Sequence, residues 1–291
     1  KVIFELFPLD FEEFLWFNAD QPTETPRLLT HYTAATGSVL MRSGWPSGAA
    51  DTDASATYLT FQSGDHFSYH QHYEQNSFTL FKYGDLAVDS GVYSSEGLSN
   101  HDINYYVRTI AHNTLVVYNP AEDLTAARPD ASSNDGGQRT MYPATRSPEN
   151  MEYFQQHAIH YDTGDLLRFE DTPRYTYALG DASKAYNNPT YNQAMDSGLA
   201  NNTAKVSRFQ RELVYLRPVA AEQQLMGDAS VLRPSSAVPN DYVVLFDRVG
   251  LVSSTFRGSN TKLLFHTLIE PTVNGVATAV SPGETLYSGA D

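Results

Sequence analysis

The sequence predicts an all-β protein, built mainly as a large antiparallel sandwich of two β-sheets. From Gly37 onward, apolar and polar residues alternate with a period of two over short stretches, as expected for strands with one buried face. Clusters of Gly, Pro, Asn and Asp separate these stretches, and no helical period of useful length follows residue 120. Many short strands joined by polar connections are typical of a β-sandwich.

Helical spacing is found ahead of this region, in residues 9–18. Apolar side chains recur there at helical intervals after Asp10, which is a favoured helix cap, and Pro22 ends the pattern. We therefore expect a terminal helix and a linker over residues 1–36, followed by a β-domain over residues 37–291.

The individual strands follow from local patterns. Val39 and Met41 fall on one face of a first strand, two residues apart. A hairpin is predicted over residues 77–89, with Gly84 supplying the dihedral angles of its turn. Further strands are predicted at 58–61, 114–118, 151–160, 165–170, 207–216, 242–249 and 262–268, and polar surface loops at 119–150, 187–204 and 226–240.

The composition excludes several classes of function. Asp and Glu outnumber Lys and Arg by 34 to 19, and the net charge of −15 argues against non-specific binding to nucleic acid. There is no apolar run long enough to predict a membrane-spanning helix. Cysteine is absent, so any bound metal must be held by His, Asp or Glu.

A cluster of histidines marks the candidate site. Five of the nine histidines lie at positions 66, 70, 72, 101 and 112. In an extended segment His70 and His72 project to the same side, and Asp89 and His112 follow from turn-rich segments nearby. Two imidazoles and one carboxylate with an open position suit a catalytic zinc site. On spacing alone, the alternative is a pair of strand histidines bonded to neighbouring carbonyl groups.

Three motifs together resemble the heparinase II/III-like family of polysaccharide lyases. They are HQHYEQNSFTL at 70–80, GDLAVDSG at 84–91 and YVRTIAHNTL at 106–115. The similarity is strong over residues 39–119 and weaker near 211–216 and 243–249. One departure is Glu74, which stands where the family usually has Asp; this longer carboxylate could still act as an outer partner of the metal ligands.

The resemblance implies a fold and an activity. Members carry an N-terminal (α/α) toroid followed by a C-terminal β-sandwich, and they cleave uronate-containing polysaccharides such as alginate, heparin or heparan sulphate by β-elimination. Residues 1–36 would then be a short remnant of the toroid. Other catalytic groups of the family lie in the toroid, so this chain would need that domain, or a chain supplying it, for full activity. A periplasmic or secreted bacterial enzyme is implied.

The resemblance also assigns roles to individual residues. Zinc would be held by His72, Asp89 and His112, while His70 and Tyr93 would face the catalytic cleft. Substrate contacts are expected from Arg42, Tyr105 and Tyr106. Two alternatives remain open: a non-catalytic carbohydrate-binding or structural sandwich that keeps its zinc, and a hydrolase with paired carboxylates, although no such pair stands out.

Overall fold

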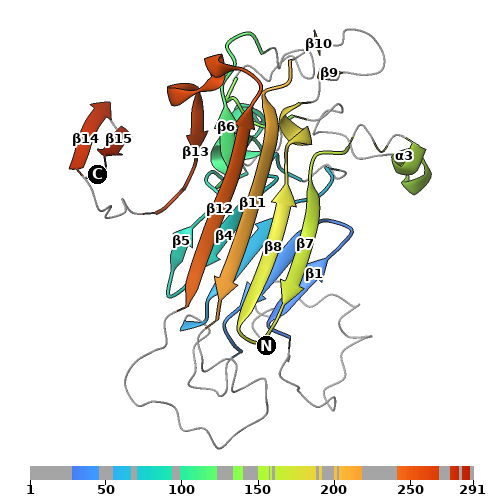
Figure 1. Cartoon of the computed structure of the whole chain (residues 1–291), viewed down its shortest axis with the longest axis vertical. Helices are drawn as coiled ribbons and strands as arrows, with labels where there is room; N and C mark the ends of the chain where they lie inside the picture. The colour runs from blue at the N-terminus through green and yellow to red at the C-terminus, as the bar shows by residue number, and fades with distance from the viewer. Residues whose placement is uncertain are drawn as a thin grey trace, which may run out of the picture.

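The computed structural model describes residues 28–45, 55–66, 71–93, 99–122, 134–139, 150–156, 158, 161–187, 190–191, 200–201, 203–217, 241–268, 276–281 and 284–288. These residues form antiparallel β-sheets with a few short helices, which confirms the predicted all-β class (Figure 1). Among them, no helix is long and apolar enough to cross a membrane. The helix expected at residues 9–18 lies outside the described residues.

The first sheet has five strands in sequence order, each antiparallel to the next. They are β1 (Thr30–Thr33), β2 (Ser38–Arg42), β3 (Tyr58–Gln62), β4 (Ser77–Phe81) and β5 (Asp85–Ala87). In β2, Val39 and Met41 are buried and Leu40 is exposed, as the alternation of the sequence predicted. The side chains on one face of this sheet therefore point into the protein.

The hairpin of β4 and β5 is confirmed, but its turn differs from the prediction. The residue with a left-handed backbone is Tyr83, at φ 58°, and not Gly84. A Cβ atom added to Gly84 would meet no other atom within 4 Å. The glycine is therefore not required by backbone angle or by space, and the prediction for Gly84 is wrong.

The second sheet has four strands in the order β12-β11-β8-β7. They are β7 (Asp165–Asp171), β8 (Tyr175–Asp181), β11 (Val206–Leu216) and β12 (Tyr242–Leu251). The sequence analysis missed β8 because its buried positions hold the small residues Thr176, Ala178 and Gly180, while larger side chains face outward. The usual contrast between large apolar and polar residues is thus reversed in this strand.

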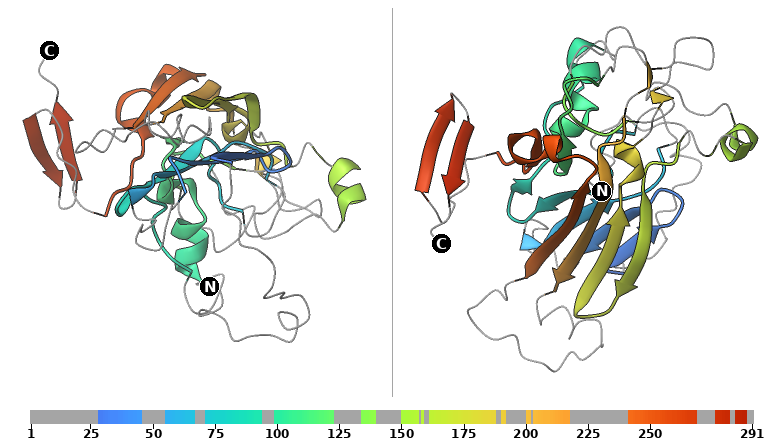
Figure 2. Two further views of the ribbon diagram at one scale, coloured as in Figure 1. Left: turned by 90° about the horizontal axis from the view of Figure 1, so that it is seen from below. Right: turned by 45° about the horizontal axis from the view of Figure 1, so that its top comes forward.

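The two sheets lie in two layers, the blue and cyan strands behind the yellow and orange ones in Figure 1, and the views of Figure 2 agree. One hydrophobic cluster joins them. The first sheet contributes Met41, Phe61 and Phe78, and the second contributes Leu213 and Tyr215. Burying each such side chain stabilises the fold by about 1.5–3 kcal/mol.

The remaining elements are short. The strands are β6 (Leu115–Val117), β9 (Thr190–Tyr191), β10 (Ala200–Asn201), β13 (Thr261–Leu263), β14 (Val276–Ser281) and β15 (Glu284–Ser288). The helices are η2 (Asp102–Tyr106), η3 (Thr109–Ala111), α3 (Met151–Gln156), η5 (Lys184–Tyr186), η7 (Ser254–Phe256) and η8 (Gly258–Asn260). A second hydrophobic cluster, which includes Leu115, Val117, Tyr186 and Phe209, packs where β6 meets β11 and η5.

The strand predicted at 151–160 is wrong, because its first part is the helix α3. The Asn150 side chain accepts a hydrogen bond from the backbone N–H of Tyr153 at 2.8 Å, which caps the helix start. None of the residues of α3 is buried. A local cap therefore decides the conformation here, where no buried face favours a strand.

Candidate metal centre

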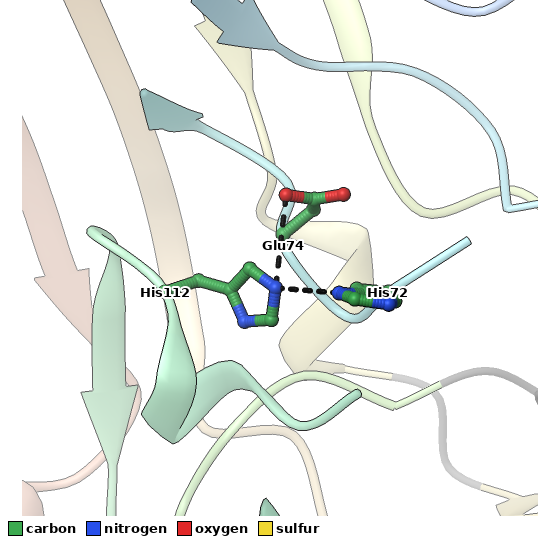
Figure 3. Close-up of side chains that lie close together, drawn as sticks. All are labelled: His72, Glu74 and His112. Carbon is green, nitrogen blue, oxygen red and sulfur yellow. Dashed lines mark hydrogen bonds and ion pairs between the residues drawn. The ribbon is translucent and has the colours of Figure 1, made fainter. Parts of the chain in front are cut away.

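Three side chains converge at one end of the first sheet: His72, Glu74 and His112 (Figure 3). His72 Nδ1 lies 2.9 Å from His112 Nε2, and His112 Nε2 lies 3.8 Å from Glu74 Oε2. Zinc bonds of about 2.0–2.2 Å allow two ligand atoms to lie up to about 4.4 Å apart. With one ligand atom from each residue within 4.8 Å of the others, this cluster could hold a metal ion.

His72 and Glu74 come from the segment that leads into β4. The segment ends in a turn in which Ser77 N donates to Glu74 O at 2.9 Å, with Asn76 at φ 61°. Asparagine tolerates this left-handed conformation better than most residues. Between His72 and Glu74, Tyr73 N donates to Val107 O at 2.9 Å and fixes the segment against the chain that leads to His112.

His112 follows η3 directly, and its ring is fully buried. Its Nδ1 lies 2.8 Å from Arg108 O. Because a carbonyl oxygen can only accept, Nδ1 carries the hydrogen and the lone pair of Nε2 faces the cluster. Burial, with the neighbouring His72, lowers the pKa of His112 to about 3. The ring is therefore neutral and suited to bind a metal at neutral pH.

Two carboxyl groups lie beside the imidazoles. Burial, followed by the charge of Asp89, raises the pKa of Glu74 to about 8, and burial raises the pKa of Asp89 to about 6. Within the described residues, Asp89 Oδ1 is buried without a hydrogen-bond partner. A divalent cation held by the cluster would favour the ionised forms of both groups. The donor set thus fits a metal ion.

Two tyrosines flank His72. The rings of Tyr106 and Tyr93 lie edge-on to the His72 ring, with centroids at 4.7 and 6.3 Å, and their own centroids are 4.7 Å apart. Tyr93 is half exposed. Burial, and then the nearby Tyr93 and the carboxylates, raise the pKa of Tyr106. Tyr106 is therefore protonated at neutral pH.

Gly91 allows this arrangement. Its φ of +90° is unfavourable for other residues, and an added Cβ would lie 3.0 Å from Tyr106 and 3.2 Å from His101. The segment after β5 can therefore cross η2 closely and bring Tyr93 to the cluster. Tyr105 is also held here, because its hydroxyl lies 2.6 Å from Ser90 Oγ.

A comparison with protein families identifies the region around this cluster. Residues 34–158 match the family model described as Heparinase II/III-like, C-terminal. The match covers less than half of the chain and includes His72, Glu74 and His112. No curated protein sequence matches the chain.

Solved structures of polysaccharide lyases are among those similar to this chain. Heparan sulfate lyase HepC from Pedobacter heparinus has 16% sequence identity and a TM-score of 0.39, over 74% of this chain and 25% of the lyase. A mutant of the same lyase has 15% identity and a TM-score of 0.39, over 66% and 22%. A heparinase III with methylated lysines has 14% identity and a TM-score of 0.35, over 66% and 20%. The chain thus spans a quarter or less of the length of these proteins.

The structure brings together two of the three predicted zinc ligands, His72 and His112. The carboxylate within 4.8 Å of both is Glu74, which the sequence analysis expected only as an outer partner. Its position two residues after His72 places both side chains on one side of an extended segment, a signal that could have identified it. A ligand role for Asp89 stays a prediction.

Two other predicted site residues are not part of this group. His70 lies outside the described residues. Arg42 stacks on Trp45 and Tyr58, with its Cζ 3.7 and 4.0 Å from their ring centroids. Tyr58 pairs with Phe81, so Arg42 lies near the end of β4 that is remote from the cluster, about 13 Å away along the strand. Its contact with substrate stays a prediction.

Proposed function

We propose that this heparinase II/III-like domain is the β-domain of a polysaccharide lyase that cleaves alginate or a glycosaminoglycan by β-elimination. The observation that carries the proposal is the cluster of His72, His112 and Glu74 beside the half-exposed Tyr93. The family match of residues 34–158 supports it, because the heparinases named in the description of that family are polysaccharide lyases. A polysaccharide substrate also implies a periplasmic or secreted protein.

We propose zinc as the metal, because imidazole and carboxylate ligands with an open position suit it. His72 and His112 would hold the ion together with Asp89, Glu74 or both. When bound, the ion would supply the positive charge that attracts a polyanion, which a chain of net charge −15 does not otherwise favour.

The proposed chemistry requires two proton transfers. A base removes the C5 proton of the uronate, the electron pair forms the C4–C5 double bond, and the C4–O bond breaks as an acid protonates the leaving oxygen. We assign one of these transfers to Tyr93, which is half exposed beside His72. Tyr106, being protonated, would orient Tyr93 or the substrate, with Tyr105 beside it. His70 is proposed to neutralise the carboxylate of the reacting uronate. Arg42, which lies remote from the cluster, is proposed to contact another sugar unit of the polymer.

A direct test measures the unsaturated uronate by its ultraviolet absorbance. The zinc-loaded chain is incubated with alginate, heparin, heparan sulphate or hyaluronate, alone and with an added toroid domain. Product formation that is lost in Tyr93→Phe is the expected result. Binding of these polysaccharides without product under both conditions would favour the carbohydrate-binding alternative. The absence of both binding and product would overturn the proposal.

A further inference from the structure

Arg211 is a fully buried cation on the inner face of the second sheet. It lies in β11 directly opposite Asp247 in β12. Its Nε and Nη2 donate to the two carboxylate oxygens of Asp247 at 2.8 and 2.9 Å. This bidentate pairing fixes the plane of the guanidinium group and directs the remaining nitrogen toward the first sheet.

That remaining nitrogen, Nη1, donates to two backbone carbonyls at once. It reaches Asn76 O at 2.7 Å and Asn113 O at 2.8 Å. Asn76 ends the turn that begins at Glu74, and Asn113 directly follows His112. One buried group on the second sheet therefore holds both segments that carry the candidate metal ligands.

Stability alone is a weak explanation for this arrangement. Burying an ion pair costs desolvation free energy that its attraction often fails to recover, and apolar replacements can be neutral or stabilising. The two segments are also linked directly, because Thr114 Oγ1 donates to Gln75 O at 2.9 Å. What Arg211 adds is a fixed position of both segments relative to the second sheet.

We propose that Arg211 is a positioning residue for the candidate metal centre: its two carbonyl contacts set the separation between the Glu74 turn and the ring of His112. The inference rests on the metal site of the proposed function, although Arg211 itself touches neither the ligand atoms nor a substrate. Lysine cannot replace it, because a single ammonium group cannot pair with Asp247 in the same fork while also reaching both carbonyls.

The test compares Arg211→Lys with a matched control, Arg217→Lys. Arg217 is also buried and is paired with Asp171 at 2.9 Å. It lies just beyond the C-terminal end of β11, about 20 Å from Arg211 along the strand. The affinity for Zn²⁺ is measured by competition with a chromophoric chelator, at a temperature where circular dichroism shows both variants folded. We expect Arg211→Lys to weaken the affinity about tenfold or more and Arg217→Lys to leave it within about twofold.

The possible outcomes separate this inference from the metal assignment. Wild-type affinity in Arg211→Lys would overturn the positioning role. If the wild-type protein binds no zinc, the metal assignment fails. The positioning role is then decided by a second measurement, the nuclear Overhauser effect between the His72 and His112 rings in metal-free protein. Loss of that contact in Arg211→Lys alone supports the role, and its retention overturns it.

A second variant covers the case in which Arg211→Lys does not fold. Asp247→Asn keeps a hydrogen-bonding partner for Arg211 but removes the charge that fixes the fork. A smaller loss of zinc affinity, between the wild-type value and a tenfold loss, is expected from the looser guanidinium. An unchanged affinity in folded Asp247→Asn would count against the positioning role.

Discussion

At the scale of single residues, the function of the candidate centre depends on which nitrogen of His112 carries the hydrogen. The carbonyl of Arg108 fixes that hydrogen on Nδ1. The same carbonyl is held in place from outside, because the Arg108 guanidinium pairs with the buried Asp135 at 2.8 Å and Asp135 also accepts from Ile110 N at 3.2 Å. The ring of His112 is thus oriented before any metal binds.

The first prediction is that His112→Ala loses the metal. Because the ion would join segments before β4 and after η3, its loss should also lower the melting temperature. Elemental analysis of protein purified without added metal should show about one equivalent of zinc in the wild type and almost none in the variant. His31→Ala is the control, since His31 is exposed on β1. Zinc retained in His112→Ala would refute the ligand role.

A second prediction concerns Glu74 and pH. In metal-free protein the folded pKa of Glu74 is about 8 against an ordinary value of 4.5, so between these values the folded state binds more protons than the unfolded state. Its contribution to stability is complete below pH 4.5 and falls as the pH rises to 8. Below pH 6.5 the lowered pKa of His112, about 3, acts in the opposite direction. We therefore expect a decrease in stability between pH 6.5 and 8.

The measurement is urea unfolding in the presence of a chelator at pH 6.5 and pH 8. Glu74→Gln should remove most of the difference, because an amide does not titrate in this range. Asp65→Asn is the matched control, since burial and the charges of Asp162 and Asp165 raise the pKa of Asp65 to about 6, which places its own change below pH 6.5. An equal pH effect in wild type and Glu74→Gln would show that another group is responsible.

The predictability of these residues has a physical basis. His72 and His112 were predictable because ligand chemistry limits the residue types, and the motif retains both. The distance between Arg42 and the cluster was not predictable from the sequence, because it depends on strand register. Only the pairing of Tyr58 with Phe81 shows which end of β4 lies near Arg42. Register is set by the buried faces of several strands together and is not readable from one segment.

At the scale of elements, the segment from β5 to η2 determines whether Tyr93 and Tyr106 reach His72. A third prediction is that Gly91→Ala destabilises the protein by about 1–3 kcal/mol, because the added methyl group meets Tyr106 and His101 and the backbone angle is left-handed. Gly84→Ala is the control. It should change the free energy of unfolding by no more than about 0.5 kcal/mol, because nothing lies within 4 Å of its Cβ position.

Both variants are measured by chemical unfolding, with tyrosine ring signals in nuclear magnetic resonance as a second readout. Gly91→Ala should shift the signals of Tyr106 and Tyr93, whereas Gly84→Ala should shift neither. Equal stability of the two variants would mean that the segment adapts to the methyl group without strain.

Two of the strands that the sequence predicted, β2 and β11, carry large side chains at alternating buried positions. Val39 and Met41 are buried in β2, and Leu213 and Tyr215 in β11. Strand β8 has no large buried side chain, because Thr176, Ala178 and Gly180 fill its inner face. Gly180 is small by necessity, since an added Cβ would lie 2.1 Å from Asn76 Oδ1, beside the turn that presents Glu74.

At the scale of the whole molecule, polar contacts join the two sheets at both ends. Near the candidate metal centre the link is Arg211. At the other end Asp241, at the start of β12, accepts hydrogen bonds from Thr57, from Tyr215 at 2.8 Å and from Lys82 at 2.5 Å. Burial alone would raise the pKa of Asp241, but these hydrogen bonds and the charge of Lys82 outweigh it and lower the pKa.

The last prediction is that the two ends act independently. Asp241→Asn should lower stability by about 1–3 kcal/mol at neutral pH, because it leaves Lys82 without its charged partner, yet it should not change zinc affinity. The difference from wild type should shrink as the pH falls through and below 3.8, where the wild-type carboxylate becomes protonated. Asp85→Asn on the exposed β5 should have little effect.

Independence is tested by combining Asp241→Asn with Arg211→Lys. Tyr215, which donates a hydrogen bond to Asp241, lies four residues from Arg211 along β11, a separation of about 13 Å. At that distance the stability losses of two substitutions usually add within about 0.5 kcal/mol. We expect additive stability losses and a zinc affinity equal to that of Arg211→Lys alone. A further loss of affinity in the double variant would show that the metal centre responds to the packing of the two sheets as a whole, and the specific contacts of Arg211 would then not explain its effect.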